Sequence, residues 1–206
     1  MSFSAYARQV RDPALPYRRR VSALRSCVQL YRPIGFHATL SYLEELAGPF
    51  EREEAALLRA LDALGASRIR RRVEVRRYAA ARRAAKRRGQ RSPRPGDANP
   101  HQLHGYWYGS PGPAALHAVR FWRRDRLPAP LASPDPIASQ VDSCVTACLT
   151  AGGALTPDQR HLLADAIESL RERIQPDLWS EDQTAYFQAR DLLTVARFVD
   201  VAADAA

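Results

Sequence analysis

Residues 67–95 read SRIRRRVEVRRYAAARRAAKRRGQRSPRP and form the most strongly basic stretch of the chain. Thirteen of its 29 residues are Arg or Lys and only Glu74 is acidic, so its net charge is +12 against +9 for the whole chain. All other residues therefore sum to −3, and the basic character of the protein is local. A concentration of positive charge of this size predicts a polyanionic partner, of which nucleic acid is the simplest.

The basic stretch fits two secondary structures, and its composition favours a helix. As a helix it has one narrow side of small and apolar residues, namely Ile69, Val73, Ala80 and Ala84. As a strand, Val73 and Val75 alternate with charged residues. Residues 78–88 are mostly strong helix formers, so we predict a helix over residues 69–88.

The part of the chain before the basic stretch carries signals for short helices. The apolar spacing of residues 18–31 predicts one of them. Ser41 followed by Glu44 has the pattern of a capping box and predicts the start of a second helix. Residues 49–64 predict a third, with glutamates in its first turn and Gly65 as its C-terminal cap.

The last third of the chain has the clearest helix signals. The Asp-Pro pair that opens residues 135–152 predicts a cap followed by a first-turn proline. Thr156 with Gln159, and Ser180 with Gln183, have the spacing of capping boxes and predict two further helix starts. Short connections between these helices predict an antiparallel unit.

A segment rich in Pro, Gly, His and aromatic residues lies between the basic stretch and these helices. Residues 90–100 and 127–136 are Pro-rich and predict two linkers. Residues 101–113 read HQLHGYWYGSPGP and predict a loop, which a short helix over residues 113–124 follows.

These signals predict a mostly α protein: an irregular helical bundle of about six to eight helices with a Pro/Gly-rich central loop segment. We expect an N-terminal helical part at residues 1–66. Residues 67–134 would hold the basic helix, the His/aromatic loop and the linkers, and residues 135–206 an acidic three-helix unit.

Charge divides along the chain in a way that leaves two functions open. Residues 1–134 carry a net charge of +16 and residues 135–206 carry −7. The first hypothesis is a non-enzymatic nucleic-acid-binding protein. The alternative is an assembly or adaptor protein, whose basic centre pairs with acidic helices of another subunit in a homo-oligomer or of an acidic protein partner.

Two groups of residues are the candidate contacts under the nucleic-acid hypothesis. The candidate phosphate-binding residues are Arg70, Arg71, Arg72, Arg76, Arg77, Arg82, Arg83, Lys86, Arg87 and Arg88, because guanidinium groups match phosphate geometry. Tyr106, Trp107, Arg120, Arg123 and Arg124 combine rings and cations, as do proteins that hold unpaired bases. The competing interpretation is that these aromatic residues form a small core.

Catalytic and metal-binding signals are weak. No motif specifies a reaction, so we nominate no catalytic residue and predict no cofactor. His101, His104 and His117 are an alternative metal site, because imidazoles at short spacing are common zinc ligands. The set lacks a fourth ligand, however, and Cys144 and Cys148 share a helical face typical of buried thiols. An enzyme built around the same loop is a third hypothesis.

The remaining composition points to the cytoplasm. Three cysteines are too few for a disulfide framework, and the start MSFSAYARQVRDP lacks the apolar core of a secretory signal. No apolar run approaches the roughly 18–20 residues that span a bilayer. We therefore expect a cytoplasmic protein with no membrane partner.

Overall fold

The computed structural model describes the chain in the ranges 1–92, 100, 106–125, 135–174 and 176–206, with the backbone alone at 176–178. Every regular element in these ranges is a helix, which confirms the predicted mostly α bundle. Most of the two predicted linkers lies outside the described residues. The chain forms two compact units, Met1–His104 and Gly105–Ala206. Within the described ranges, no helix has both the length and the apolar content needed to cross a bilayer.

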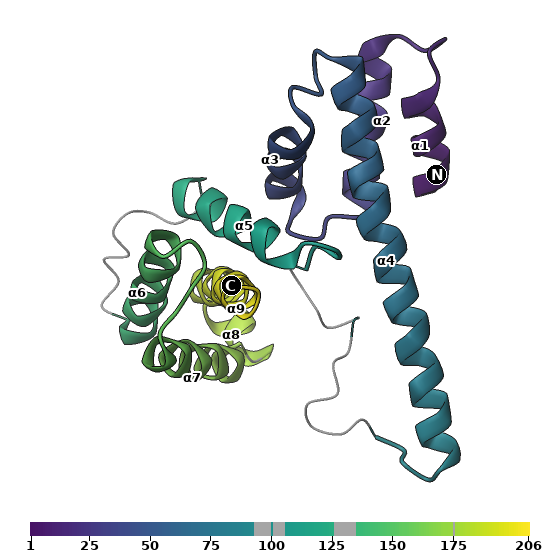
Figure 1. The fold of residues 1–206 in the computed structure, drawn as a ribbon. Coiled ribbons are helices and arrows are strands. Elements are labelled where there is room, and N and C mark those ends of the chain that lie inside the picture. Colours follow the sequence, from purple (N-terminus) through teal and green to yellow (C-terminus); the bar gives the residue numbers. More distant parts are fainter. Residues whose placement is uncertain (93–99, 101–105, 126–134, 175) are drawn as a thin grey trace. The chain divides into compact units, whose positions relative to one another are not determined.

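The first unit consists of α1 (Phe3–Arg11), α2 (Tyr17–Leu30), α3 (Phe36–Ala47) and α4 (Glu54–Arg87). α1 packs on α2, α3 packs on α4, and α4 also contacts α1 and α2. Figure 1 shows these three helices gathered around the N-terminal half of α4, whose C-terminal half runs on beyond them. The largest fully buried side chains of this core are Leu24, Ile34, Leu43, Leu57, Leu61 and Leu64.

α4 runs without interruption for 34 residues, a length of about 50 Å. The prediction that Gly65 ends a helix is wrong, because Gly65 lies inside α4 and has no positive φ. Leu61 and Leu64 before it and Ser67 after it are all buried, and the Ser67 hydroxyl lies 2.9 Å from the hydroxyl of Tyr31. Packing on both sides of Gly65 outweighs the roughly 1 kcal/mol that glycine costs in a helix.

Two other helix starts in this unit differ from the prediction. α3 begins at Phe36, directly after Gly35, whose φ of 91° is open to glycine and strained for other residues. Ser41 and Glu44 therefore lie inside α3 and do not cap it, so that prediction is wrong. α4 begins at Glu54, after a turn, and not at residue 49.

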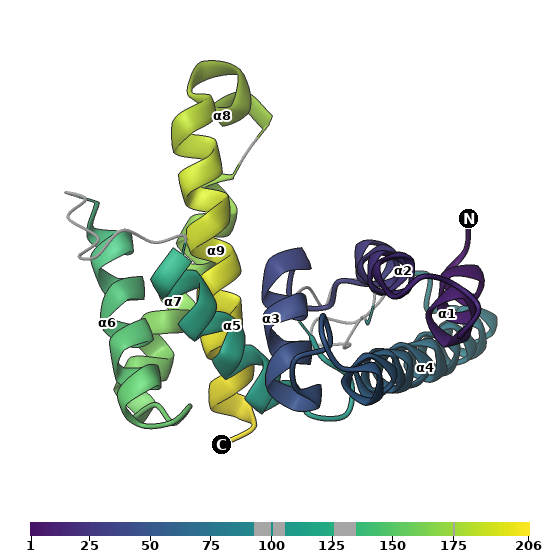
Figure 2. The same ribbon diagram turned by 90° about the horizontal axis from the view of Figure 1, so that it is seen from above.

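The second unit consists of α5 (Pro111–Asp125), α6 (Pro136–Thr150), α7 (Pro157–Arg173), α8 (Pro176–Glu181) and α9 (Gln183–Asp204). α9 contacts each of the other four helices, and Figure 2 shows it as the long helix that α5 crosses obliquely. Gly112 lets the start of α5 approach the end of α9, since a Cβ at this position would lie 2.6 Å from the Cβ of Ala205.

Helix caps in the second unit confirm two predictions and correct a third. Asp135 accepts a hydrogen bond from the first-turn amide of α6 at 3.0 Å. The side chains of Thr156 and Gln159 each accept a hydrogen bond from the other residue's amide, at 3.3 and 2.9 Å, which is the predicted capping box. Ser180, in contrast, lies in α8, and α9 is capped by Asp182.

The two units divide the chain differently from the three parts expected from the sequence. The basic part of α4 continues a helix of the first unit, whereas α5 packs on α6 and α9 of the second. The predicted middle part, residues 67–134, is thus shared between the two units.

Candidate nucleic-acid interface

α4 leaves the core of the first unit at Arg68. The guanidinium of Arg68 lies 4.3 Å from the centre of the Phe3 ring of α1, a cation–π contact. Burial lowers the pKa of Arg68, and the nearby Arg72 adds to this effect. Beyond this point Ala85 is the one buried side chain of α4. Arg68 is therefore an anchor between α1 and α4, and the residues after it form a projecting helix.

The projecting part of α4, residues 69–88, presents the predicted phosphate-binding residues to solvent. Arg71 and Arg82 are half-buried, and the others are exposed: Arg70, Arg72, Arg76, Arg77, Arg83, Lys86, Arg87 and Arg88. Among the residues that the structure describes, the one carboxylate paired with any of them is Glu74, which lies 2.8 Å from Arg77. Exposed pairs of this kind contribute about 0–1 kcal/mol and are readily exchanged for another anion.

Arg82 has a structural role at the end of the helix. Its guanidinium donates to the backbone carbonyls of Gln90 and Arg91, at 3.3 and 3.0 Å. Gly89, with φ of 87°, turns the chain, and the amide of Gln90 then donates to the carbonyl of Ala85. This arrangement closes α4 and leaves Arg82 fewer donors for a ligand than the exposed arginines have.

The like charges of the projecting part oppose its own helix. Cations four residues apart, as in Arg72 with Arg76 and Arg83 with Arg87, destabilise an isolated helix by a few tenths of a kcal/mol each. Alanine and arginine both have high helix propensity, and this counteracts the repulsion. A bound polyanion would relieve the repulsion while leaving the helix in place.

The second group of candidates belongs to the other unit, and most of it is engaged there. Trp107 is only 4 % exposed, so its ring is covered, and Tyr106 packs edge-on against Tyr108 at 4.9 Å. This placement matches the small-core interpretation of these aromatic residues. Arg123 pairs with Asp142 of α6.

The last two arginines of α5 differ from each other. Arg124 pairs with its neighbour Asp125 at 2.9 Å and lies 5.7 Å from the centre of the Phe121 ring. Arg120 is exposed and pairs with no carboxylate in the described ranges. The structure does not bring these residues and the arginines of α4 into one compact unit.

The histidines and cysteines do not assemble into a site within the described residues. His101 and His104 lie outside those residues, and His117 is buried in α5. Cys144 and Cys148 are fully buried on α6, and burial raises the pKa of both thiols. In the ranges that the structure covers, no three His, Cys, Asp or Glu side chains are grouped as metal ligands.

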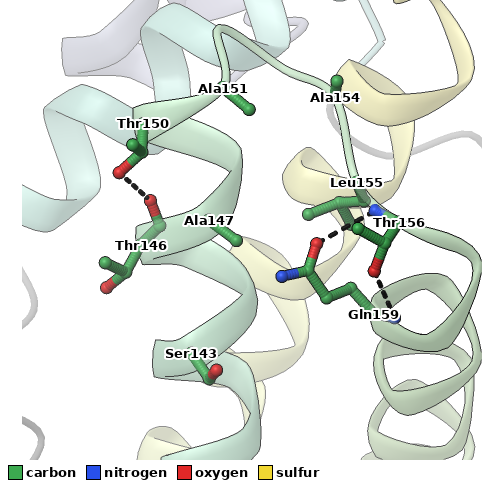
Figure 3. A pocket seen from close by; sticks show the side chains of 9 residues that line it. All are labelled: Ser143, Thr146, Ala147, Thr150, Ala151, Ala154, Leu155, Thr156 and Gln159. Atoms are coloured by element: carbon green, nitrogen blue, oxygen red, sulfur yellow. Dashed lines mark hydrogen bonds between the residues drawn. The ribbon is translucent and has the colours of Figure 1, made fainter.

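An open hollow of about 660 Å³ lies between α6 and the start of α7 (Figure 3). Its polar lining comes from Ser143, Thr146, Thr150, Thr156 and Gln159, with no ionisable side chain among the lining residues. Thr150 donates to the carbonyl of Thr146 at 2.8 Å, and Thr156 and Gln159 form the capping box described above. The residues lining the hollow therefore include no side chain that could act as an acid or a base, and none that could activate one of the hydroxyl groups as a nucleophile.

One exposed cluster was not predicted. Trp179 of α8 makes edge-on contacts with Tyr186 and Phe187 of α9, at 5.2 and 5.4 Å, and Arg190 lies over the ring of Phe187 at 4.9 Å. Trp179 and Phe187 are 43 and 40 % exposed. Aromatic residues seven and eight positions apart across a helix start were the only sequence signal of this cluster.

The projecting part of α4 is thus the one surface where the structure gathers most of the predicted site residues in an exposed form. Comparisons with models of known families, with curated proteins and with solved structures give no match to this chain.

Proposed function

We propose that the protein binds nucleic acid and that the projecting part of α4 contacts the phosphate backbone. The supporting observation is the charge of this part of α4, together with the scarcity of carboxylates paired with it among the residues that the structure describes. Residues 69–88 hold ten basic and one acidic side chain, a net charge of +9, and the described carboxylates occupy only Arg77. A dense set of exposed guanidinium groups on one rigid element suits a ligand with regularly spaced phosphates.

The assembly alternative has less support from the charges available. Residues 105–206 hold 9 basic and 13 acidic side chains, a net charge of −4. Among the described residues, five of those carboxylates already pair with arginines of their own unit. The second unit of another copy therefore brings too little free negative charge to neutralise the net charge of +9 on the projecting part of α4. A partner protein would need to be much more acidic than this chain.

The protein is placed in the cytoplasm under this proposal, where nucleic acid is accessible. Its three cysteines are free and buried, which is compatible with a reducing compartment.

Salt dependence gives the first test. Eight exposed cations set an upper limit of about −7 for the slope of log K against log salt on duplex DNA, or about −6 on single strands. The full chain is titrated with duplex DNA, single-stranded DNA and RNA of equal length at several salt concentrations. We expect binding that weakens steeply with salt.

A matched pair of variants assigns the binding to α4. The test variant replaces Arg72, Arg76, Arg83 and Arg87 with Ala. The control replaces four exposed arginines elsewhere in the first unit with Ala, namely Arg8, Arg18, Arg19 and Arg52. Both variants change the net charge equally, and alanine preserves the helix. The test variant should lose about three to four units of the salt slope, and the control about one or less. No binding of any nucleic acid at low salt, or equal losses in both variants, would overturn the proposal.

A further inference from the structure

Seven of the nine arginines of the projecting part form two rows, one on each flank of a single face of α4. Arg72, Arg76, Arg83 and Arg87 are spaced by 4, 7 and 4 residues, so the 3.6-residue period keeps them in line along one flank. Arg70, Arg77 and Arg88 are spaced by 7 and 11 residues and are in line along another. By this period the rows are separated by about a third of the circumference of the helix.

A strip of small and apolar side chains occupies the face between the two rows. It consists of Ile69, Val73, Ala80 and Ala84, which again are spaced by 4, 7 and 4 residues. Ile69 is 62 % exposed and Val73 is 39 % exposed, although both are apolar. The same period places this strip on the side of α4 opposite the buried Leu57, Leu61 and Leu64. The strip therefore faces away from the core of the first unit, where a large ligand can approach.

The width of this face matches the major groove of duplex DNA. A helix with side chains is about 10–12 Å across, and the major groove of B-DNA is about 12 Å wide. The small strip would let the helix approach the base edges, and the two arginine rows would reach the phosphates on either side. We propose that the projecting part of α4 lies in the major groove of duplex DNA, with one arginine row on each strand. This inference rests on the proposed function and names the form of nucleic acid.

Other occupants of the same face fit it less well. The major groove of A-form RNA is deep and narrow and does not admit side chains, so an RNA duplex would meet the arginines on its outer surface only. A second copy of α4 would bring two arginine rows against two others, and like charges repel. A membrane-surface helix presents several large residues such as Trp, Phe or Leu, whereas this strip has only Ile69 and Val73 as large apolar residues.

Two valines provide a matched test of groove entry. Val73 lies in the strip, whereas Val75 lies 18 residues, or five full turns, after Leu57 and hence on the opposite side. Val73→Trp should hold the helix away from the groove floor and weaken binding to duplex DNA about tenfold or more. The reason is that the arginines of one row would then no longer reach the phosphates of their DNA strand. Val75→Trp makes the same change in size and should alter the affinity less than about twofold.

The probes are duplex DNA and duplex RNA of equal length, measured at one salt concentration with the full chain, after circular dichroism has shown native helicity in both variants. We expect the wild type to prefer the DNA duplex about tenfold or more, because only its groove admits the helix. Equal affinity for the two duplexes, or equal effects of the two Trp variants on DNA binding, would overturn groove insertion while leaving arginine-dependent binding intact. If the wild type bound neither duplex nor single strands, the proposed function itself would fail.

Discussion

Replacing Gly65 with Ala should stabilise the first unit, because Gly65 lies in the interior of a continuous helix. A Cβ at this position would have no heavy atom within 4 Å, so the new methyl group causes no clash. Alanine is favoured over glycine in a helix interior by about 1 kcal/mol. Since the first unit is about 100 residues long, this gain raises its midpoint of thermal unfolding by about 4 °C.

The distribution of tryptophan lets the two units be followed separately. The three tryptophans, Trp107, Trp122 and Trp179, all belong to the second unit. Tryptophan fluorescence therefore reports the unfolding of that unit, whereas far-ultraviolet circular dichroism follows all helices. Gly65→Ala should shift the dichroism transition of the first unit upwards and leave the fluorescence transition unchanged.

Gly35→Ala is the control for backbone conformation: Gly35 lies just before α3, whereas Gly65 lies inside α4. Gly35 also has nothing within 4 Å of a Cβ, but its φ is 91°. A left-handed conformation costs a residue with a Cβ about 1–2 kcal/mol, so this variant should be destabilised. If Gly65→Ala were also destabilising by about 1 kcal/mol, Gly65 would be a C-terminal cap, and α4 would be two helices.

Three further predictions concern polar groups that are buried or half-buried. Burial raises the pKa of Cys27 to about 11, so this fully buried thiol should resist alkylation at pH 8 until the protein is unfolded. Alkylation is followed by the mass of the Cys27 peptide, and labelling of the folded protein at the rate of a free thiol would contradict this prediction. Burial alone would raise the pKa of Asp135, but hydrogen bonds from Arg173 and from the first-turn amide of α6 hold it below its ordinary value. The stabilisation that this carboxylate provides is therefore complete above the unfolded pKa of 3.8 and is lost as the pH falls through the lower folded pKa. Asp135→Asn should destabilise the second unit at pH 6 and match the wild type once the pH is below both values, as followed by tryptophan fluorescence. Arg20 is buried and donates to a carbonyl of α1 at 2.8 Å, so Arg20→Met should cost about 1–3 kcal/mol in chemical denaturation. Its partner Glu54 is 56 % exposed, and Glu54→Gln should cost less than about 1 kcal/mol; equal costs would contradict this assignment.

The sequence predicted those parts of the fold that local hydrogen bonds determine. Asp135 before a proline, and Thr156 with Gln159, mark helix starts that the structure contains. In both cases a side chain satisfies backbone amides within the first turn, so the information needed is present in four adjacent residues. The mostly α class followed from the same signals.

Predictions failed where tertiary packing overrides the local pattern. The pair Ser41 and Glu44 has capping spacing, but Ala38 and Thr39 before it are buried, and the helix already starts at Phe36, directly after Gly35. Glycine is a common residue at the end of a helix, yet buried residues on both sides of Gly65 keep α4 continuous through it. Neither outcome is visible in a short window, because each depends on residues far away in the chain.

The candidate site, like the fold, could be predicted from the sequence only in part. The basic helix could be predicted because a charge excess is a property of composition, and exposure is the ordinary state of arginine. The roles of Trp107 and Arg123 could not, since the burial of Trp107 and the ion pair of Arg123 with Asp142 of α6 depend on how the second unit packs. The two arginine rows were present in the spacing of the sequence, but they gain meaning only once the helix is known to project from the core.

The continuity of α4 is what holds its exposed arginines on a rigid helix. A segment of about 20 residues with many like charges and little burial is a marginal helix in water, because starting a helix is unfavourable. Here the start lies in the core of the first unit, where Leu57, Leu61 and Leu64 fix the first turns. The projecting part then only has to extend an existing helix, which its alanines and arginines favour. A break at Gly65 would remove this advantage and separate the arginine rows from the rigid body that orients them. A helix breaker at this position, Gly65→Pro, should therefore weaken any binding by α4 although it removes no cation, whereas a change that strengthens the helix there should not weaken it.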